Sequence, residues 1–398
     1  MGGETLIINN AILNGKAVDI TIVDGLINDI QPHINTPLLP GEGQGVRLDA
    51  SGLTIFPGLC NMHSHAPMTL FRGLGDDQPL DVWLNDYIWP AEQRLTDELV
   101  YEGTLQACRE MLASGTTFFN DMYFRLPAMA QAVRDSGIKS RLGFNVFGDG
   151  DELENFQLST FNFQLSIAPH SIYTVSEKGL RRCADVCAET HLPMHIHMSE
   201  TQKEVDDCLR EHGCRPWVWL DKLGILDKLG ENIIAAHCLH LSENEIRLIG
   251  DHHITCVHCP NSNLKLGSGY RFPMLELLDA GAKVALGTDG SASSNNLDMI
   301  EVMKTAALLQ KGWRGDPTVV PASQILSLAT LGHTIAPGQP ADLFLVRSAE
   351  SEGLSCPGAA AISELRTPNS ELSDLVYASH GESVVMTVVD GKIVYQNK

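Results

Sequence analysis

The chain has 398 residues, of which 43% are hydrophobic and 19% charged, a balance typical of a folded protein with a large core. Lys and Arg number 28 against 49 Asp and Glu, and the formal net charge of −21 disfavours nucleic-acid and anionic-membrane partners. No run approaches the roughly 20 apolar residues that span a membrane, and the first residues lack a basic and apolar leader. These features predict a cytoplasmic protein.

Both ends of the chain have the pattern of short β-strands. Residues 5–35 alternate apolar and polar side chains around turn signals such as Asp24 and Gly25. Residues 384–395 have the same pattern around Asp390 and Gly391. Because chain termini often lie close together, we expect the two segments to pair in one sheet.

Between the two ends, short apolar runs alternate with helical patterns. One helix is predicted between Thr96, a favourable N-cap, and Gly115. The connection 149–163 is short and acidic, so we expect its helix to be missing or degenerate. Eight strands alternating with helices predict an α/β barrel, which carries its chemistry at the carboxyl ends of the strands. The eight runs are 53–56, 116–121, 142–146, 165–170, 194–197, 233–237, 254–258 and 284–289.

Metal-binding residue types follow these runs. Two imidazoles that are two residues apart on a strand point the same way, and this spacing occurs in the pair His63 and His65 and again in His195 and His197. Three imidazoles and a carboxylate suit a catalytic zinc ion that keeps one position for water. The spacing leaves open which histidine lies outside the ligand set. The candidates at or just beyond the strand ends are His63, His65, His197, His237 and Asp289.

The sequence also indicates how many metal ions the site holds. The fourth run ends in Pro169 and His170, with no lysine of the kind that bridges two ions in related barrels. We therefore expect one divalent metal ion, zinc. Core or surface histidines without a metal are the alternative interpretation, and four histidines and an aspartate together at strand ends make it the weaker one.

Glu200 is a candidate for proton transfer because it lies three residues after His197. A carboxylate beside a metal site can move protons between water and substrate. The alternative is an ordinary glutamate at a helix start, with Ser199 or Thr201 as the cap. Within the set of strand-end residues, we favour proton transfer.

The order of these motifs resembles the metal-dependent amidohydrolase superfamily over nearly the whole chain. The matching segments are 56–59 before His63, His197 with Glu200, 236–238, 287–290 and 337–343. The branch that deaminates 5′-methylthioadenosine and S-adenosylhomocysteine is similar at 66–73, 76–80, 89–92, 169–171 and 261–266. The resemblance implies a (β/α)8 TIM-like barrel over residues 56–335 and a small β-sandwich formed by residues 1–55 and 336–398.

The resemblance also implies roles for individual residues. Without it, Glu92 would be interpreted as a solvated glutamate and His170 as a core histidine. By resemblance, Glu92 binds the ribose hydroxyls, His170 contacts the substrate near the purine, and Glu200 both contacts the substrate and transfers protons. The implied metal ligands are His63, His65, His197 and Asp289, and the implied catalytic residues are Glu200, His237 and Asp289, with His237 beside the attacking water.

The implied activity is hydrolytic deamination of an adenosine-type nucleoside, such as 5′-methylthioadenosine, S-adenosylhomocysteine, adenosine or 5′-deoxyadenosine, to the inosine-type product and ammonia. One alternative is deamination of another heterocycle, of the aminodeoxyfutalosine, guanine or pterin type. An alternative of another class is a catalytically silent metal-binding scaffold. The expected partner is a small nucleoside, and exposed barrel helices in this branch lead us to expect a homo-oligomer.

Overall fold

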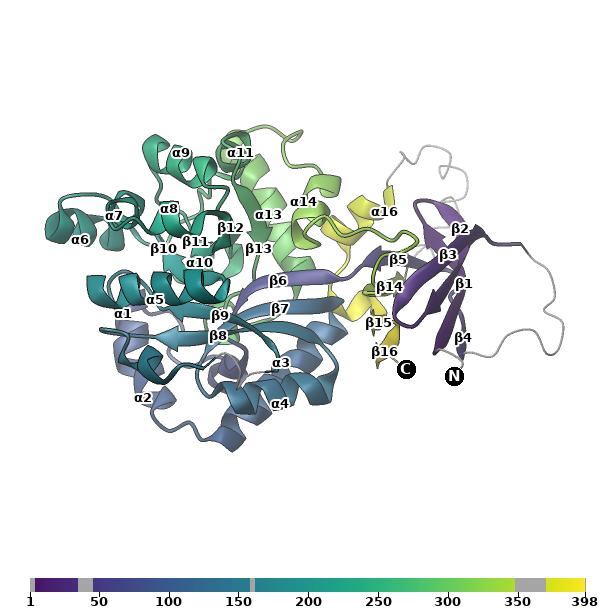
Figure 1. Cartoon of the computed structure of the whole chain (residues 1–398). Helices are drawn as coiled ribbons and strands as arrows, with labels where there is room; N and C mark the ends of the chain where they lie inside the picture. The colour runs from purple at the N-terminus through teal and green to yellow at the C-terminus, as the bar shows by residue number, and fades with distance from the viewer. Residues whose placement is uncertain (1–3, 35–45, 158–161, 348–369, 398) are drawn as a thin grey trace.

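The computed structural model describes residues 4–34, 46–157, 162–347 and 370–397, which divide between a strand barrel and a separate sheet (Figure 1). The barrel strands pair in chain order, each parallel to its neighbour. At the seam, the N–H of Asp289 donates to the carbonyl of His63 over 2.9 Å, so the barrel is nearly closed. The predicted α/β barrel is confirmed. Its strands are β6 (Leu59–Ser64), β7 (Thr116–Tyr123), β8 (Lys139–Val146), β9 (Gln164–Pro169), β10 (Met194–Met198), β11 (Ile233–His237), β12 (Thr255–His258) and β13 (Lys283–Leu286).

Helices lie around this barrel (Figure 1). The predicted helix after Thr96 is α3, whose first turn is capped by the Thr96 side chain accepting the N–H of Leu99 over 3.3 Å. The described α-helices are α1 (Leu80–Val82), α2 (Trp89–Glu92), α3 (Asp97–Ala113), α4 (Leu126–Ser136), α5 (Glu177–Thr190), α6 (Gln202–His212), α7 (Pro216–Lys222), α8 (Ile225–Leu229), α9 (Glu243–Asp251), α10 (Pro260–Lys265), α11 (Met274–Asp279), α12 (Ser291–Ser294), α13 (Met299–Arg314), α14 (Ala322–Ala329) and α16 (Ser370–Ser373).

The connection between β8 and β9 lacks an α-helix in its described part, residues 147–157 and 162–163. It holds only the 3-10 turn Asp151–Asn155. The expectation of a missing or degenerate helix is therefore confirmed for those residues.

The strands from the two chain ends form one mixed sheet, as predicted. Strand β5 joins the two halves because it pairs in parallel with β1 and antiparallel with β14. The described strands make a single hydrogen-bonded sheet. They are β1 (Thr5–Leu13), β2 (Lys16–Val23), β3 (Leu26–Pro32), β4 (Val46–Asp49), β5 (Leu53–Pro57), β14 (Leu343–Arg347), β15 (Val384–Val389) and β16 (Lys392–Gln396).

The prediction that residues 53–56 form the first barrel strand is wrong. These residues belong to β5 of the terminal sheet, and the first barrel strand is β6, which carries His63. The chain changes sheets at Gly58, where an added Cβ would lie 2.1 Å from the side chain of Thr117. Only a glycine allows the backbone to pass so close to β7.

Four buried clusters hold these parts together, and the second in size includes Met111 and Phe119. The largest lies between the barrel and its helices and includes Trp217, Ile196 and Met198. A small cluster fills part of the barrel interior, and another packs against the terminal sheet. The nine described cysteines are free and buried, so they pack as small apolar side chains. None of the described helices is long and apolar enough to cross a membrane.

Candidate metal centre and active site

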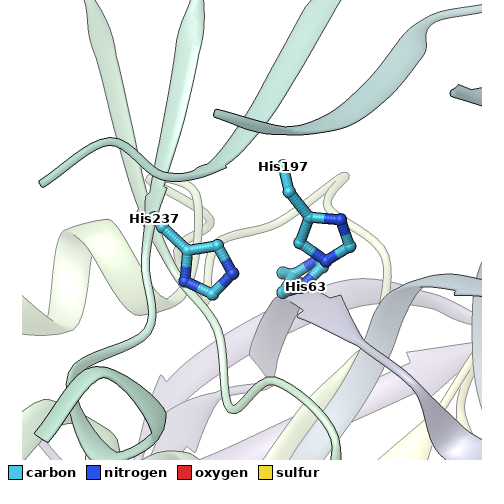
Figure 2. A group of neighbouring side chains, drawn as sticks. All are labelled: His63, His197 and His237. Atoms are coloured by element: carbon cyan, nitrogen blue, oxygen red, sulfur yellow. The ribbon is translucent and has the colours of Figure 1, made fainter. Parts of the chain in front are cut away.

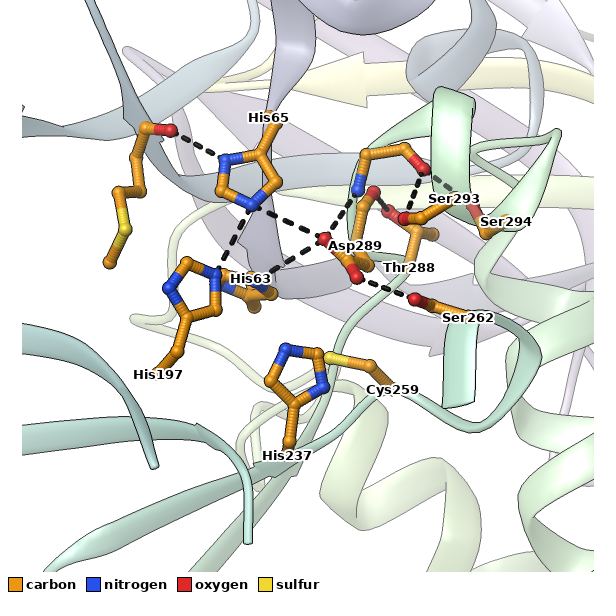
Figure 3. Close-up of polar contacts among 12 residues, drawn as sticks. His63, His65, His197, His237, Cys259, Ser262, Thr288, Asp289, Ser293 and Ser294 are labelled. Atoms are coloured by element: carbon orange, nitrogen blue, oxygen red, sulfur yellow. Dashed lines mark hydrogen bonds and ion pairs between the residues drawn. The ribbon is translucent and has the colours of Figure 1, made fainter. Parts of the chain in front are cut away.

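The predicted strand-end residues meet at the carboxyl end of the barrel. His63 lies at the end of β6, His197 on β10 and His237 at the end of β11, and their rings converge (Figure 2). His65 and Asp289 come just after β6 and β13 and join the same group (Figure 3). Parallel strands bring these residues together although up to 226 positions separate them in the sequence.

Strand alternation explains the inward direction of the β10 histidines. Met194, Ile196 and Met198 pack in the cluster between the barrel and the helices. His195 and His197 therefore point into the barrel from the opposite face of the strand. Both side chains are buried, but only His197 belongs to a group of potential metal ligands among the described residues.

Two of the imidazoles are held in a defined tautomer by backbone carbonyls. Nδ1 of His65 lies 2.6 Å from the carbonyl of Met122, and Nδ1 of His197 lies 2.7 Å from the carbonyl of His170. A carbonyl oxygen can only accept, so each Nδ1 carries the ring proton and donates it. In both rings Nε2 is consequently the nitrogen with the free lone pair.

These lone pairs face one another and the carboxylate of Asp289 (Figure 3). The two Nε2 atoms of His65 and His197 lie 3.3 Å apart. Oδ1 of Asp289 lies 3.3 Å from Nε2 of His65 and 3.4 Å from Nε2 of His63. Two unprotonated nitrogens at such a separation repel each other unless a cation lies between them.

The residues therefore fit a metal ion. Two overlapping ligand groups, one of His63, His197 and His237 and one of His63, His65 and Asp289, each have their ligand atoms within 4.8 Å of one another. Nε2 of His63 is buried and has no hydrogen-bond partner, which is costly for a polar atom unless a ligand satisfies it. Imidazoles combined with a carboxylate are typical of zinc sites.

Burial sets the protonation states of this group. It lowers the pKa of His63 to about 4 and the pKa of His197 well below the usual value. Burial would raise the pKa of Asp289, but the contact with His63 and its charge, followed by the charges of His65 and His237, hold that pKa well below its usual range. At neutral pH His63 and His197 are thus neutral and the Asp289 carboxylate is ionised, the forms that bind a metal.

The carboxylate of Asp289 is fixed by its neighbours. Ser262 Oγ donates to Oδ2 over 2.6 Å, and the N–H of Gly290 donates to Oδ1 over 2.7 Å. The side chain of Asn61 makes two hydrogen bonds to the preceding residue, Thr288. Its amide nitrogen donates to Oγ1 over 2.7 Å, and its amide oxygen accepts from the backbone N–H over 2.9 Å. These contacts tie the loop after β13 to β6 and hold Asp289 beside His63.

His237 differs from the other imidazoles in its surroundings. Its Nδ1 lies 2.9 Å from the amide nitrogen of Asn263, and an amide N–H can only donate. In this orientation of the amide, Nε2 of His237 carries the ring proton, and it lies 3.7 Å from Oε2 of Glu200. His237 is therefore placed to donate a hydrogen bond toward the cavity.

Glu200 enters the cavity instead of capping a helix. The cap of α6 is Thr201, whose side chain accepts the N–H of Glu204 over 3.1 Å. Oε1 of Glu200 accepts a hydrogen bond from Ser268 Oγ over 3.1 Å. The backbone N–H groups of Ser199 and Glu200 donate to the carboxylate of Glu204 at 2.7 and 2.8 Å, which fixes the turn that carries Glu200.

Several site residues have backbone conformations that side chains rarely adopt. The φ angles of Ser199, His237 and Asp289 are 51°, 73° and 62°. Left-handed conformations at non-glycine residues are strained and cluster at functional sites. At His237 the positive φ lies where β11 ends, and it allows the ring to turn toward the cavity.

Glu92 and His170 line the same cavity from other parts of the chain. Burial raises the pKa of Glu92, although the nearby Tyr123 hydroxyl and the charge of His65 oppose the shift. Burial lowers the pKa of His170 to about 3, and its Nδ1 contacts Thr174 Oγ1 over 3.0 Å. The His170 ring also stacks on Phe147, with ring centroids 5.1 Å apart.

The cavity combines polar groups with apolar walls, the usual character of a small-molecule site. Its polar lining consists of His65, Glu92, Asn145, His170, His197, Glu200, His237, Asp289 and Ser293. Its apolar and aromatic walls include Met68, Leu80, Trp83, Leu84, Ile88, Trp89, Phe124, Phe147, Tyr173 and Leu266. Seven of the eight predicted site residues line this cavity. The eighth, His63, is fully buried and contacts the Asp289 carboxylate.

Some contributing residues were not predicted. Ser262 and Asn263 lie on α10, inside the segment 261–266 that is part of the family resemblance. The resemblance therefore pointed to this segment, but it did not predict the contacts of these two side chains. Glu204 and Ser268 had no comparable signal. Their contacts depend on the turn before α6 and on the loop after α10, which only the folded chain brings together.

Comparison with known proteins agrees with this geometry. The sequence model of the amidohydrolase family matches residues 54–394. The 5′-deoxyadenosine deaminase of Methanothermobacter thermautotrophicus is 38% identical, over 100% of this chain and 94% of its own length. The 5-methylthioadenosine/S-adenosylhomocysteine deaminase of Moorella thermoacetica is 39% identical, over 92% and 88%. A crystal structure of an adenosine deaminase from Xanthomonas campestris with bound zinc is 31% identical, with a TM-score of 0.82 over 98% of this chain and 92% of that one.

Proposed function

The chain belongs to the amidohydrolase family, and on that premise we propose that it hydrolytically deaminates adenosine nucleosides, including those altered at the 5′ position. Water replaces the exocyclic amino group, and the products are the inosine-type nucleoside and ammonia. One observation carries the proposal: imidazole lone pairs and the Asp289 carboxylate converge at one side of a cavity that Glu200 and Glu92 also enter. The names of the relatives point to the same substrates.

A single divalent ion, zinc, is assigned to His63, His65, His197 and Asp289. The tautomers of His65 and His197 present Nε2 to the ion, and the buried Nε2 of His63 gains a partner. His237 is left outside the ligand set in the amide orientation in which Asn263 donates to Nδ1 and Nε2 carries the ring proton. A half-turn of this amide, whose buried Oδ1 has no hydrogen-bond partner, would instead free Nε2 to bind the ion. When bound, zinc supplies Lewis acidity that makes water a nucleophile near neutral pH.

Glu200 is assigned the proton transfers. Its carboxylate lies in the cavity, 3.7 Å from Nε2 of His237, so both groups can contact one water molecule. Glu200 takes a proton from the attacking water and delivers it to the ring nitrogen next to the amino-bearing carbon. Glu200 then takes the proton of the hydroxyl group formed on the attacked carbon and delivers it to the amine, which departs as ammonia as the carbonyl group forms. His237 and Asp289 orient the water.

We also propose a division of the chain into two domains. Residues 56–335 form the hydrolase barrel, and residues 1–55 and 336–398 form a small β-sandwich at its side. The mixed sheet of the described terminal strands and its own buried cluster support a separate unit. Strand β5, Leu53–Pro57, crosses the first boundary and connects the two units.

The proposed function is tested with a panel of adenosine, 5′-deoxyadenosine, 5′-methylthioadenosine, S-adenosylhomocysteine and guanine. The change of the adenine ultraviolet spectrum to that of hypoxanthine and the release of ammonia are measured together. We expect turnover of one or more of the adenosine nucleosides and little turnover of guanine. Turnover of guanine alone, or of no compound by zinc-loaded protein, would contradict the proposal.

Glu92 should determine the preference for a nucleoside over a free base. Its half-buried carboxylate lies in the cavity and can accept hydrogen bonds from both ribose hydroxyls. We expect Glu92→Gln to lower kcat/KM for adenosine by about 10-fold to 100-fold, because each lost charge-assisted hydrogen bond is worth roughly 1.5–3 kcal/mol. Turnover of adenine, which has no ribose for Glu92 to bind, should change little. Equal losses for adenosine and adenine would contradict the ribose role.

A further inference from the structure

We propose that His195, supported by Asn120, is a positioning residue that orients the metal ligand His63. The proposal rests on the metal site assigned above. His195 lies on the inward face of β10, two residues before His197, yet it belongs to neither ligand group of the described chain. Its Nε2 instead lies 2.9 Å from Nδ1 of His63.

The contact holds His63 from the side opposite the metal site. Nε2 of His63 faces Asp289 at 3.4 Å, and Nδ1 faces His195. The rings of His63 and His195 are nearly perpendicular, at 89°, with centroids 5.0 Å apart. Both side chains are fully buried, so water does not compete for this contact.

Asn120 holds His195 in turn. Its amide nitrogen lies 3.0 Å from Nδ1 of His195 and 3.1 Å from the carbonyl of Met62, and Met62 precedes His63 in β6. Strands β6, β7 and β10 thus each contribute one residue to a line that runs from Asn120 through His195 to His63. The line ties the ring of His63 to the rigid interior of the barrel.

The contact with His195 also determines which ring nitrogen of His63 is free to bind the metal. For Nε2 to bind a metal, Nδ1 must carry the ring proton and donate it, and Nε2 of His195 is the atom placed to accept it. His195 then carries its own proton on Nδ1, so the Asn120 amide must turn over from the orientation described above, in which its N–H donates to Nδ1 of His195 and to the Met62 carbonyl. Oδ1 of Asn120 is buried without a hydrogen-bond partner. A half-turn of the amide would present this oxygen to His195, with loss of the contact to Met62.

His258 is a buried histidine of the same barrel that serves for comparison with His195. It is as fully buried as His195 and lies at the end of β12. Neither of its ring nitrogens has a hydrogen-bond partner, and the ring stacks on Phe272 with centroids 4.4 Å apart. His258 therefore acts as an apolar packing group, and its replacement is a matched control for the loss of a buried imidazole.

The test compares His195→Gln, His195→Asn and His258→Gln with the wild type. A glutamine amide reaches the position of Nε2 and can still accept from His63, whereas an asparagine amide reaches only the position of Nδ1. The two variants at position 195 have equal polarity and differ by one methylene group. Zinc affinity of the metal-free protein is measured by competition with a chelator, and the visible spectrum of the cobalt-substituted protein reports the geometry of the site.

We expect His195→Asn to weaken zinc binding by about 10-fold to 100-fold, the usual effect of removing the group that orients a metal ligand. The cobalt spectrum of this variant should also change. Zinc binding by His195→Gln and His258→Gln should stay close to that of the wild type. Melting of each metal-free variant shows whether it is folded.

The outcomes separate this inference from the proposed function. Unchanged zinc affinity in His195→Asn, or equal losses in His195→Asn and His195→Gln or His258→Gln, would overturn the positioning role. The deaminase panel can fail while zinc affinity still depends on position 195, and then only the proposed function is wrong. A wild-type chain that binds no zinc would overturn both the metal assignment and this inference.

Discussion

Glu200→Gln is expected to lower kcat for deamination by about 10²-fold to 10⁴-fold, the range associated with general acid–base catalysis. The amide keeps the shape of the side chain and can still accept the hydrogen bond of Ser268. It cannot take a proton from water or deliver one to the ring. Because Glu200 is not among the assigned ligands, the zinc content of the variant should equal that of the wild type.

Steady-state kinetics on the preferred nucleoside, together with metal analysis of the same samples, check this result. Glu189→Gln is the matched control because Glu189 is exposed on α5, outside the described cavity. Its kcat should equal that of the wild type. Full activity in Glu200→Gln would remove Glu200 from the mechanism, and loss of zinc in this variant would place it among the ligands instead.

Removal of the Asp289 carboxylate should abolish both zinc retention and turnover. Asp289→Asn keeps the size of the side chain and an oxygen that accepts from Ser262 or Gly290. It loses the negative charge that lies beside the imidazoles of His63 and His65. We expect dialysed protein to hold much less than one zinc per chain and kcat/KM to fall by about 10³-fold or more, because the main electrostatic element of the site is lost.

The measurement is the zinc content of dialysed protein, read beside the activity. Wild-type protein should hold one zinc per chain, lose activity with a chelator and regain it when zinc is restored. Asp279→Asn, at an exposed aspartate that ends α11, should behave like the wild type. Two zinc ions per wild-type chain would contradict the single-ion assignment, and a fully loaded, active Asp289→Asn would exclude Asp289 from the ligands.

The sequence predicted the barrel and most of the residues that meet in its cavity. Apolar runs that end in His or Asp are local patterns, and parallel strands bring their carboxyl ends to one place whatever the details of packing. This is why the strand ends carrying His197 and His237 could be identified from the order of runs alone, whereas the strand that carries His63 was misplaced at residues 53–56. The alternation of side chains along β10 also follows from the local spacing of His195 and His197.

Other features depended on contacts between distant segments. Residues 53–56 have the composition of a barrel strand, but pairing with β14 places them in the terminal sheet. The sequence also could not show which of His195 and His197 is a candidate metal ligand, because the two residues lie on the same inward face of one strand. Their difference lies in their partners: the carbonyl of His170 for His197, and the ring of His63 for His195.

The sequence by itself determined the α/β alternation, the pairing of the chain ends and the set of candidate ligands, because hydrophobic periodicity and strand order are properties of short segments. Only the tertiary structure decided which nitrogen each imidazole presents, how His237 and Asp289 turn inward through positive φ angles, and how Glu92 and Glu200 reach one cavity. Those features depend on hydrogen bonds and steric contacts among residues from different strands, and no pattern within a single segment records them.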